Sequence, residues 1–96
     1  MAVSPRPPRD RYIAFRLEAP AGVSRDAFLA ALRARVPSAS LLSLRGGMGL
    51  VRCTNLDKDA TIAALVALDR VGSETVRVTT LGTSGTIRKA TQKYLR

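Results

Sequence analysis

The chain has 96 residues, 46% of them hydrophobic and 24% charged, and this composition indicates one globular domain with a modest core. Sixteen basic residues against seven acidic ones give a net charge of +9, which favours a polyanionic partner over a surface without a specific ligand. Nucleic acid is favoured over a membrane surface, because no basic helix has a wide apolar face backed by Trp or Phe. The single cysteine excludes an internal disulfide framework, and no apolar run is long enough to span a bilayer, so we expect a cytoplasmic protein.

Residues 1–9 form a Pro/Arg-rich segment that we expect to be a flexible tail, and residues 10–96 are expected to form a single domain. Alternating apolar residues predict a half-buried strand over Arg11–Leu17, which Pro20 and Gly22 end. A helix then begins after Ser24, a suitable N-cap, and stops at Pro37.

A glycine-rich stretch over residues 46–49 predicts a hairpin between the strands Leu41–Arg45 and Leu50–Thr54. The side chains expected to face the core from these strands are Leu42, Leu44, Val51 and Cys53.

A second helix is predicted to begin at Asn55 or Asp57 and to run to about Val71, where Gly72 would end it. Its inward side chains are expected to be Ile62, Leu65, Val66 and Leu68. A strand over Thr75–Leu81, with Val76 and Val78 inward, and a basic terminal helix complete the chain. The order predicts a ferredoxin-like βαββαβ sandwich of the α+β class, with a four-stranded antiparallel sheet, two helices on one face and an additional C-terminal helix.

The segment Gly82–Lys89 reads Gly-Thr-Ser-Gly-Thr-Ile-Arg-Lys and opens the terminal helix. Glycine and hydroxyl residues at a helix N-terminus, next to free backbone N–H groups and followed by cations, suit a phosphate. Ser and Thr before a helix are also ordinary caps, and a glycine there also suits a tight turn. The candidate phosphate ligands of this region are Ser84, Gly85, Thr86, Arg88, Lys89, Lys93 and Arg96.

The terminal helix is predicted to have two functional sides. Ile87, Ala90 and Tyr94 recur at helical spacing and should pack on the domain. Lys89, Lys93 and Arg96 form a second stripe that is free to meet phosphates.

If the predicted alternation holds, each strand places one arginine on the sheet face away from the two helices. These are Arg16, Arg45, Arg52 and Arg77. Together they would form a broad phosphate-binding surface; alternatively they are ordinary solvated charges, or the terminal helix covers part of this face. Tyr12 is the only aromatic residue available there, so stacking of single-stranded bases is not expected, and contacts to the phosphates and shape of folded RNA are more natural.

A catalytic site within the protein is not expected. The chain has no histidine, and Cys53 lies mid-strand without a predicted base beside it. Asp57 and Asp59 are more typical of a helix start than of a metal or acid–base pair, and no cysteine–histidine cluster suits zinc. The glycine-rich hairpin lacks the Walker pattern of a nucleotide-binding loop. The residues thus predict a binding module.

The run from Gly82 to Leu95, with Ser84–Arg88 as its most specific part, and the segment Arg11–Phe15 resemble the archaeal ribonuclease P protein component 2 family. That family is related to the small subunit shared by eukaryotic ribonucleases P and MRP. The resemblance covers roughly residues 9–96. It implies a non-catalytic subunit that binds and stabilises the catalytic RNA, which removes the 5′ leader from precursor tRNA.

The resemblance also implies the partners. They are ribonuclease P RNA, protein component 3 in a two-plus-two heterotetramer, and precursor tRNA indirectly; no membrane is involved. Magnesium is expected in the RNA and no cofactor on the protein. Two other hypotheses remain open from the residues: a small RNA- or ribosome-associated binding protein unconnected to an enzyme, and a regulatory module with a small-molecule pocket at a dimer interface.

Overall fold

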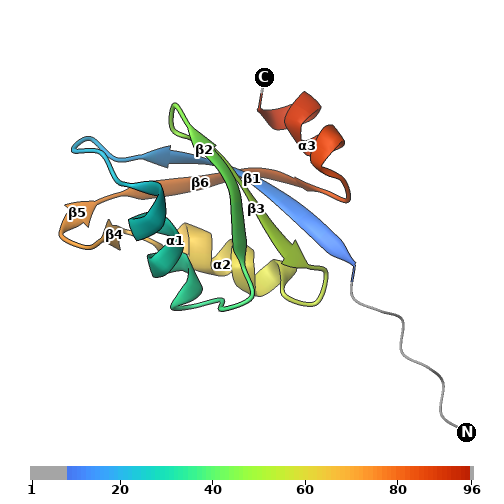
Figure 1. The fold of residues 1–96 in the computed structure, drawn as a ribbon, viewed down its shortest axis with the longest axis horizontal. Coiled ribbons are helices and arrows are strands. Elements are labelled where there is room, and N and C mark those ends of the chain that lie inside the picture. Colours follow the sequence, from blue (N-terminus) through green and yellow to red (C-terminus); the bar gives the residue numbers. More distant parts are fainter. Residues whose placement is uncertain (1–8, 96) are drawn as a thin grey trace, which may run out of the picture.

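The computed structural model describes residues 9–95 and places one antiparallel sheet between helices on both of its faces (Figure 1). The elements are β1 (Asp10–Glu18), α1 (Arg25–Arg33), β2 (Ser40–Arg45), β3 (Met48–Thr54), α2 (Lys58–Ala67), β4 (Arg70–Val71), β5 (Glu74–Thr75), β6 (Arg77–Ser84) and α3 (Ile87–Tyr94). The tail predicted for residues 1–9 lies outside this part of the chain except for Arg9, as does Arg96, so the predicted domain boundary stays a prediction.

The main sheet has the strand order β2-β3-β1-β6, and all its neighbours are antiparallel. This order, with α1 and α2 as the two connections, confirms the predicted ferredoxin-like fold. The short strands β4 and β5 form a separate hairpin that the sequence did not predict. The predicted end of the second helix was therefore wrong: α2 ends at Ala67, and Gly72, at φ +61°, forms the turn between β4 and β5.

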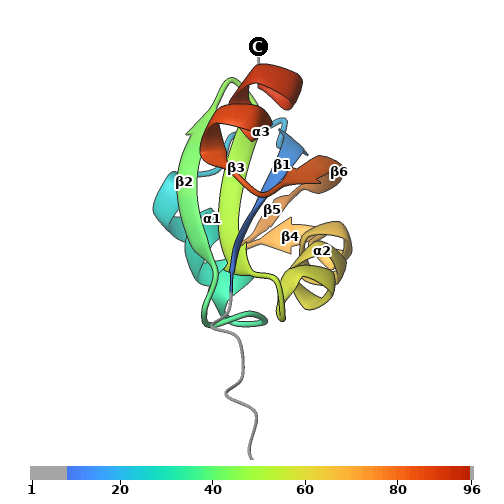
Figure 2. The same ribbon diagram turned by 90° about the vertical axis from the view of Figure 1, so that its right-hand side faces the viewer.

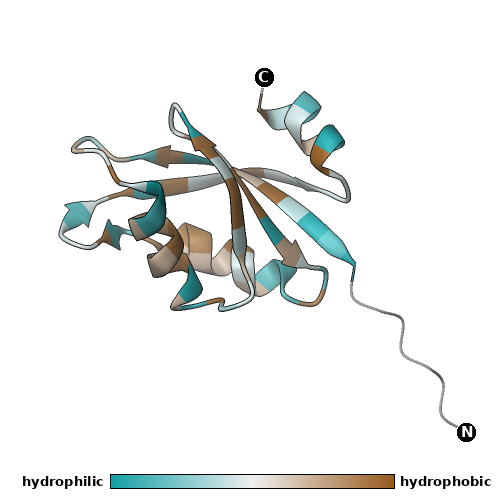
Figure 3. Cartoon of the chain, viewed as in Figure 1, coloured by the Kyte–Doolittle hydropathy of each residue, from teal (hydrophilic) through white to brown (hydrophobic). Residues whose placement is uncertain are grey.

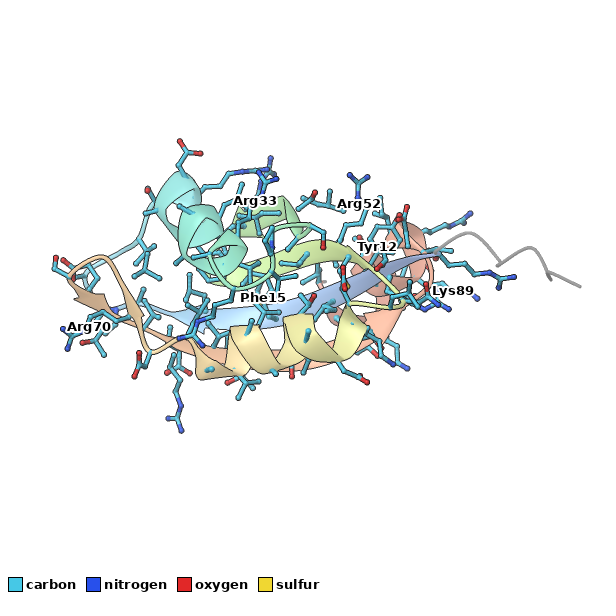
Figure 4. The ribbon with its side chains drawn as sticks, turned by 90° about the horizontal axis from the view of Figure 1, so that it is seen from below. Tyr12, Phe15, Arg33, Arg52, Arg70 and Lys89 are labelled. Atoms are coloured by element: carbon cyan, nitrogen blue, oxygen red, sulfur yellow. The ribbon has the colours of Figure 1, made fainter. Side chains whose placement is uncertain are left out.

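The principal core lies between the sheet and the pair α1 and α2. Ile13 and Phe15 of β1 are fully buried there, and the ring of Phe15 stacks on that of Phe28 of α1 with centroids 5.2 Å apart. Gly49 of β3 lies against the Phe15 ring, and a Cβ atom at that position would collide with it. Figure 4 shows Phe15 between the sheet and the helices, in the middle of the molecule.

The helix starts follow the predicted residues. The Ser24 side chain caps α1, because its Oγ accepts the backbone N–H of Ala27 at 3.1 Å. Asp57 is the N-cap residue of α2, but its carboxylate accepts the hydroxyl of Ser38 at 2.8 Å and makes no capping bond. The link between Asp57 and Ser38 joins the start of α2 to the segment before β2.

Two predicted core positions were wrong. Leu42 was expected in the principal core, but the register shifts between Leu41 and Ser43, so Leu41 fills that core and Leu42 packs on the opposite face. Val66 is 57% exposed, because the buried stripe of α2 runs through Thr61, Ala64 and Leu65 instead. A helix that is apolar on most sides does not reveal its buried face by periodicity alone.

The terminal helix α3 lies on the sheet face opposite α1 and α2 (Figure 2). Ala90 of α3 is fully buried against a second cluster that contains Tyr12, Ala14 and Leu50. In residues 9–95, no helix is long and apolar enough to cross a membrane.

Candidate nucleic-acid interface

The turn between β6 and α3 is built by its hydroxyl side chains. The Thr86 Oγ1 accepts the backbone N–H of Lys89 at 3.1 Å and caps α3, and the Ser84 Oγ accepts the backbone N–H of Thr86 at 3.4 Å. Both hydroxyls thus have a structural role in this turn. Their bonds hold the start of α3 so that Arg88 and Lys89 follow the turn directly and are exposed.

Gly85 leaves the backbone of this turn open. Its φ lies outside the left-handed region, so the turn does not need glycine for its conformation. A Cβ atom at Gly85 would approach only the Nη1 atom of Arg11, at 3.7 Å, so an alanine would fit there without a clash. The fold therefore does not require glycine at this position.

The same measurement places Arg11 beside the turn, a cation that the charge pattern alone did not single out. Its Nη1 also donates to the carbonyl oxygen of Asp10 at 3.0 Å. In the sequence, only the Arg-Tyr start of the first strand pointed to Arg11, because this segment is part of the family resemblance. Arg11 adds a positive charge from β1 to those of Arg88 and Lys89.

Lys89 and Lys93 lie on the flank of α3 that faces β6. With Thr83, Ser84 and Gln92 they line a hollow of about 430 Å³. The Lys93 Nζ lies 5.4 Å from the centroid of the Tyr94 ring. The predicted basic stripe is thus confirmed as an exposed surface for its first two members, and Arg96 lies outside the described residues.

The packing side of α3 differs from the prediction at one position. Ala90 and Tyr94 face the sheet as expected, whereas Ile87 is 48% exposed. Tyr94 lies over Gly82 of β6, where a Cβ atom would collide with the tyrosine ring. Ile87 lies beside residues of β2 at the edge of the sheet and does not enter the apolar cluster between α3 and the sheet.

The four arginines predicted to share a face do share it. In the register of the sheet, Arg52 lies opposite Tyr12, and both Arg16 and Arg45 lie opposite Met48, so their side chains stand on the α3 side. Arg77 lies opposite Glu18 on that same side. All four arginines are exposed.

Helix α3 divides this face into two parts. In the apolar cluster under α3, Ala14 and Leu50 lie between Arg52 and the other three arginines along the strands, whereas Tyr12 lies opposite Arg52. Arg16, Arg45 and Arg77 lie past Leu50 toward the other end of the sheet. The arginines therefore flank α3, instead of forming one uninterrupted surface. Figure 4 shows Tyr12, Arg52 and Lys89 in the half of the molecule away from Arg70.

This surface carries exposed cations, whose charge suits an anion. Burial raises the pKa of the Cys53 thiol, although the neighbouring Thr61 side chain opposes this in part, so the thiol stays protonated and is a poor nucleophile. Among residues 9–95, no group of three or more His, Cys, Asp or Glu side chains is arranged to hold a metal ion. What the described side chains offer is a set of exposed cations on one side of the sheet.

Comparison with known proteins identifies the family. The model of the Rpp14/Pop5 family matches residues 36–95. The chain belongs to the Rpp14/Pop5 family.

Among its relatives is the protein of Archaeoglobus fulgidus named ribonuclease P protein component 2, which is 37% identical over 97 residues, covering 91% of this chain and 89% of the relative. The protein of the same name from Methanosarcina acetivorans is 32% identical over 99 residues, covering 92% of this chain and 75% of the relative. These identities over nearly the whole chain confirm the family resemblance that the motifs had indicated.

A chain in the cryo-EM structure of yeast ribonuclease MRP has the same fold. The superposition has a TM-score of 0.64 with 13% sequence identity and covers 81% of this chain and 75% of the yeast chain. At this identity the likeness concerns the fold.

The two sides of α3 are separable by mutation. Tyr94→Ala removes the ring that covers Gly82, and we expect it to lower the free energy of unfolding by about 2–3 kcal/mol. Tyr94→Phe, which keeps the ring, is the matched control and should melt close to the parent protein. The triple variant Lys89→Ala, Lys93→Ala, Arg96→Ala should keep its melting temperature but bind RNA more weakly, with a salt slope reduced by about two to three units.

Thermal unfolding followed by circular dichroism and RNA binding at several salt concentrations measure both effects. The opposite result, in which the charges are needed for folding and Tyr94 only for RNA, would mean that Tyr94 stacks on a base and does not hold the helix.

Proposed function

We propose that this protein is a non-catalytic subunit of ribonuclease P, which binds and stabilises the catalytic RNA for removal of the 5′ leader from precursor tRNA. The observation that carries the proposal is the 37% identity to a ribonuclease P protein component 2 over 89% of that relative's length. The hypothesis of an RNA- or ribosome-binding protein unconnected to an enzyme is not favoured, because these relatives carry the ribonuclease P name.

The exposed cations would bind the RNA through its phosphates. Folded RNA brings phosphates close together, and a protein with a net charge of +9 offsets their mutual repulsion. The surface would consist of two parts. One is the group Arg16, Arg45 and Arg77; the other is Arg52 with the turn at Ser84–Thr86 and the cations of α3. Each neutralised phosphate releases counterions, so binding should weaken steeply with salt.

The hydrolysis is assigned to the RNA. The chain contains no histidine, and the Cys53 thiol is buried with a raised pKa, so neither of these two groups is offered at this surface as a base or nucleophile. Magnesium would be bound by the RNA subunit, and no cofactor by the protein. The complex would work in the cytoplasm. Precursor tRNA would bind the RNA subunit and would contact this protein only indirectly.

The outer face of α2 is the proposed contact with protein component 3. Leu56, just before α2, is 75% exposed and Val66 is 57% exposed, and the exposed residues between them include Ala60 and Ala63. Figure 3 shows α2 coloured as apolar over most of its length, in contrast to α3. Exposed large apolar residues on one helix face suit a protein partner, and a small core makes such a partner useful for stability. We take the assembly to be a two-plus-two heterotetramer.

The arginine surface is tested by charge reversal. Changing Arg16, Arg45, Arg52 and Arg77 together to Glu should abolish RNA association without unfolding the protein, because all four side chains are exposed. If each arginine meets one phosphate, the four arginines together account for about four units of the slope of log binding constant against log salt concentration. The matched control reverses four cations elsewhere, namely Arg33, Arg35, Lys58 and Arg70. Equal loss in both variants would mean that net charge, and not this face, binds RNA.

The partner surface is tested by co-expression with component 3. Val66→Glu places a charge in the exposed apolar face of α2 and should abolish co-purification, whereas Ala30→Glu on the exposed side of α1 should not. Light scattering of the purified complex measures the two-plus-two stoichiometry. If the two parent proteins stay separate monomers well above micromolar concentration, the proposed pairing is wrong.

Reconstitution tests the function itself. The protein alone should not cleave precursor tRNA, whereas its addition to the cognate RNA and the other protein subunits should restore leader cleavage at low magnesium. Cleavage by an RNA-free preparation, lost on a point mutation in the protein, would contradict the assignment of catalysis to the RNA. If the protein binds RNA with strong salt dependence but leaves leader cleavage unchanged, it is an RNA-binding protein unconnected to this enzyme.

A further inference from the structure

A groove of about 620 Å³ lies beside α3, on the flank away from the lysines. Its sides come from β2, from the start of β3 and from the flank of α3 that carries Ile87, Thr91 and Leu95. Apolar side chains form much of the lining, and the apolar members are Leu42, Leu44, Met48, Leu50, Ile87 and Leu95. Neither the RNA-binding surface nor the outer face of α2 includes this groove as a whole.

The groove runs along a sheet edge. Among the strands of residues 9–95, β2 is the outermost of its sheet and pairs only with β3, so its other edge presents backbone N–H and C=O groups. At one end of this edge, the Nη2 atom of Arg25 donates to the carbonyl oxygen of Leu41 at 2.7 Å. The stretch from Leu42 to Arg45 borders the groove. An extended peptide could add to such an edge as a further strand.

The charge of the lining favours an acidic occupant. Its charged members are Arg25, which reaches β2 from α1, and Arg45 at the hairpin end of β2, and the lining residues include no carboxylate. The floor also lacks an aromatic side chain, so it offers no platform on which a nucleic-acid base would stack. Apolar side chains of a peptide match the floor, and carboxylates on the opposite face of an extended peptide match Arg25, which approaches β2 from the α1 side.

We propose that this groove binds an extended segment of a protein partner in which apolar and acidic residues alternate. The segment pairs with the free edge of β2 in the neighbourhood of Leu42–Arg45. Alternate side chains of an extended strand point to opposite faces, so the apolar ones enter the groove between β2 and α3 and the acidic ones point to the α1 side, where Arg25 lies. The proposal goes beyond the proposed function, because peptide binding at β2 requires neither RNA nor component 3.

The direct test is an NMR titration of the isotope-labelled full chain with a synthetic peptide of alternating Val and Glu. We expect shifts of the backbone amides of β2 and of the methyl groups of Met48 and Ile87. Two control peptides separate the contributions. A peptide of alternating Val and Lys tests charge, and a Val–Glu peptide with N-methylated alternate amides tests backbone pairing. Both should bind at least about tenfold more weakly, a difference of about 1.4 kcal/mol.

Matched variants locate the site on the protein. Ile87→Glu places a carboxylate in the groove wall and should weaken binding of the Val–Glu peptide about tenfold or more, whereas Val66→Glu, an exposed apolar residue of α2, should not change it. Arg25→Gln should weaken binding and should also lower the salt dependence of binding. Ile87→Glu must also keep the parent melting temperature, which its exposure predicts.

Three results would overturn the proposal: no shifts at millimolar peptide, equal binding of the Val–Lys peptide, or shifts confined to α2. If an RNA fragment shifts the methyl signals of Met48 and Ile87 and prevents the Val–Glu peptide from binding, the groove belongs to the RNA-binding surface instead. None of these results bears on leader cleavage, so the outcome here and the outcome of the reconstitution remain distinguishable.

Discussion

The packing of Tyr94 and Ala90 of α3 onto the open face of the sheet is the contact on which the candidate interface depends. A half-exposed sheet would leave Tyr12, Ala14 and Leu50 in water, and α3 buries them. The contact is close because Gly82 of β6 has no side chain under the tyrosine ring. The position of α3 then determines where the other surface features lie. The Ser84–Thr86 turn lies at one end of β6, the lysines of α3 face β6, and a groove remains beside β2.

The exposed cations contribute little to folding, and this separates their role from that of the core. Ion pairs at a solvated surface stabilise proteins by roughly 0–1 kcal/mol each, so a surplus of nine positive charges is not explained by stability. The same charges on one sheet face would act together on a polyanion, where the gain in free energy would come from released counterions. The division of the arginines by α3 suggests how such a surface would be used: two basic areas on either side of a helix can meet two different stretches of a folded RNA backbone.

Several elements could be predicted because their signals are local. Alternation identified β1 and β6, Ser24 marked the start of α1, and period-two placement put the four arginines on one face. The errors arose where the pattern was ambiguous or interrupted. The extra residue in β2 reversed the direction of Leu42, the nearly uniform apolar character of α2 concealed that Val66 faces outward, and Gly72 belongs to a hairpin that only two residues on each side define.

The sequence by itself determined the fold class, the basic character of the surface and the family, because these follow from periodicity, charge and a specific motif near the C-terminus. Only the tertiary structure decided how α3 lies on the sheet, which cations stand beside the turn, and where an apolar groove remains. Arg11 comes next to Gly85 although 74 positions separate them in the chain, counted from 11 to 85. Such neighbours depend on strand pairing and on the rotation of one helix about its axis, and a linear pattern of residues carries no record of either.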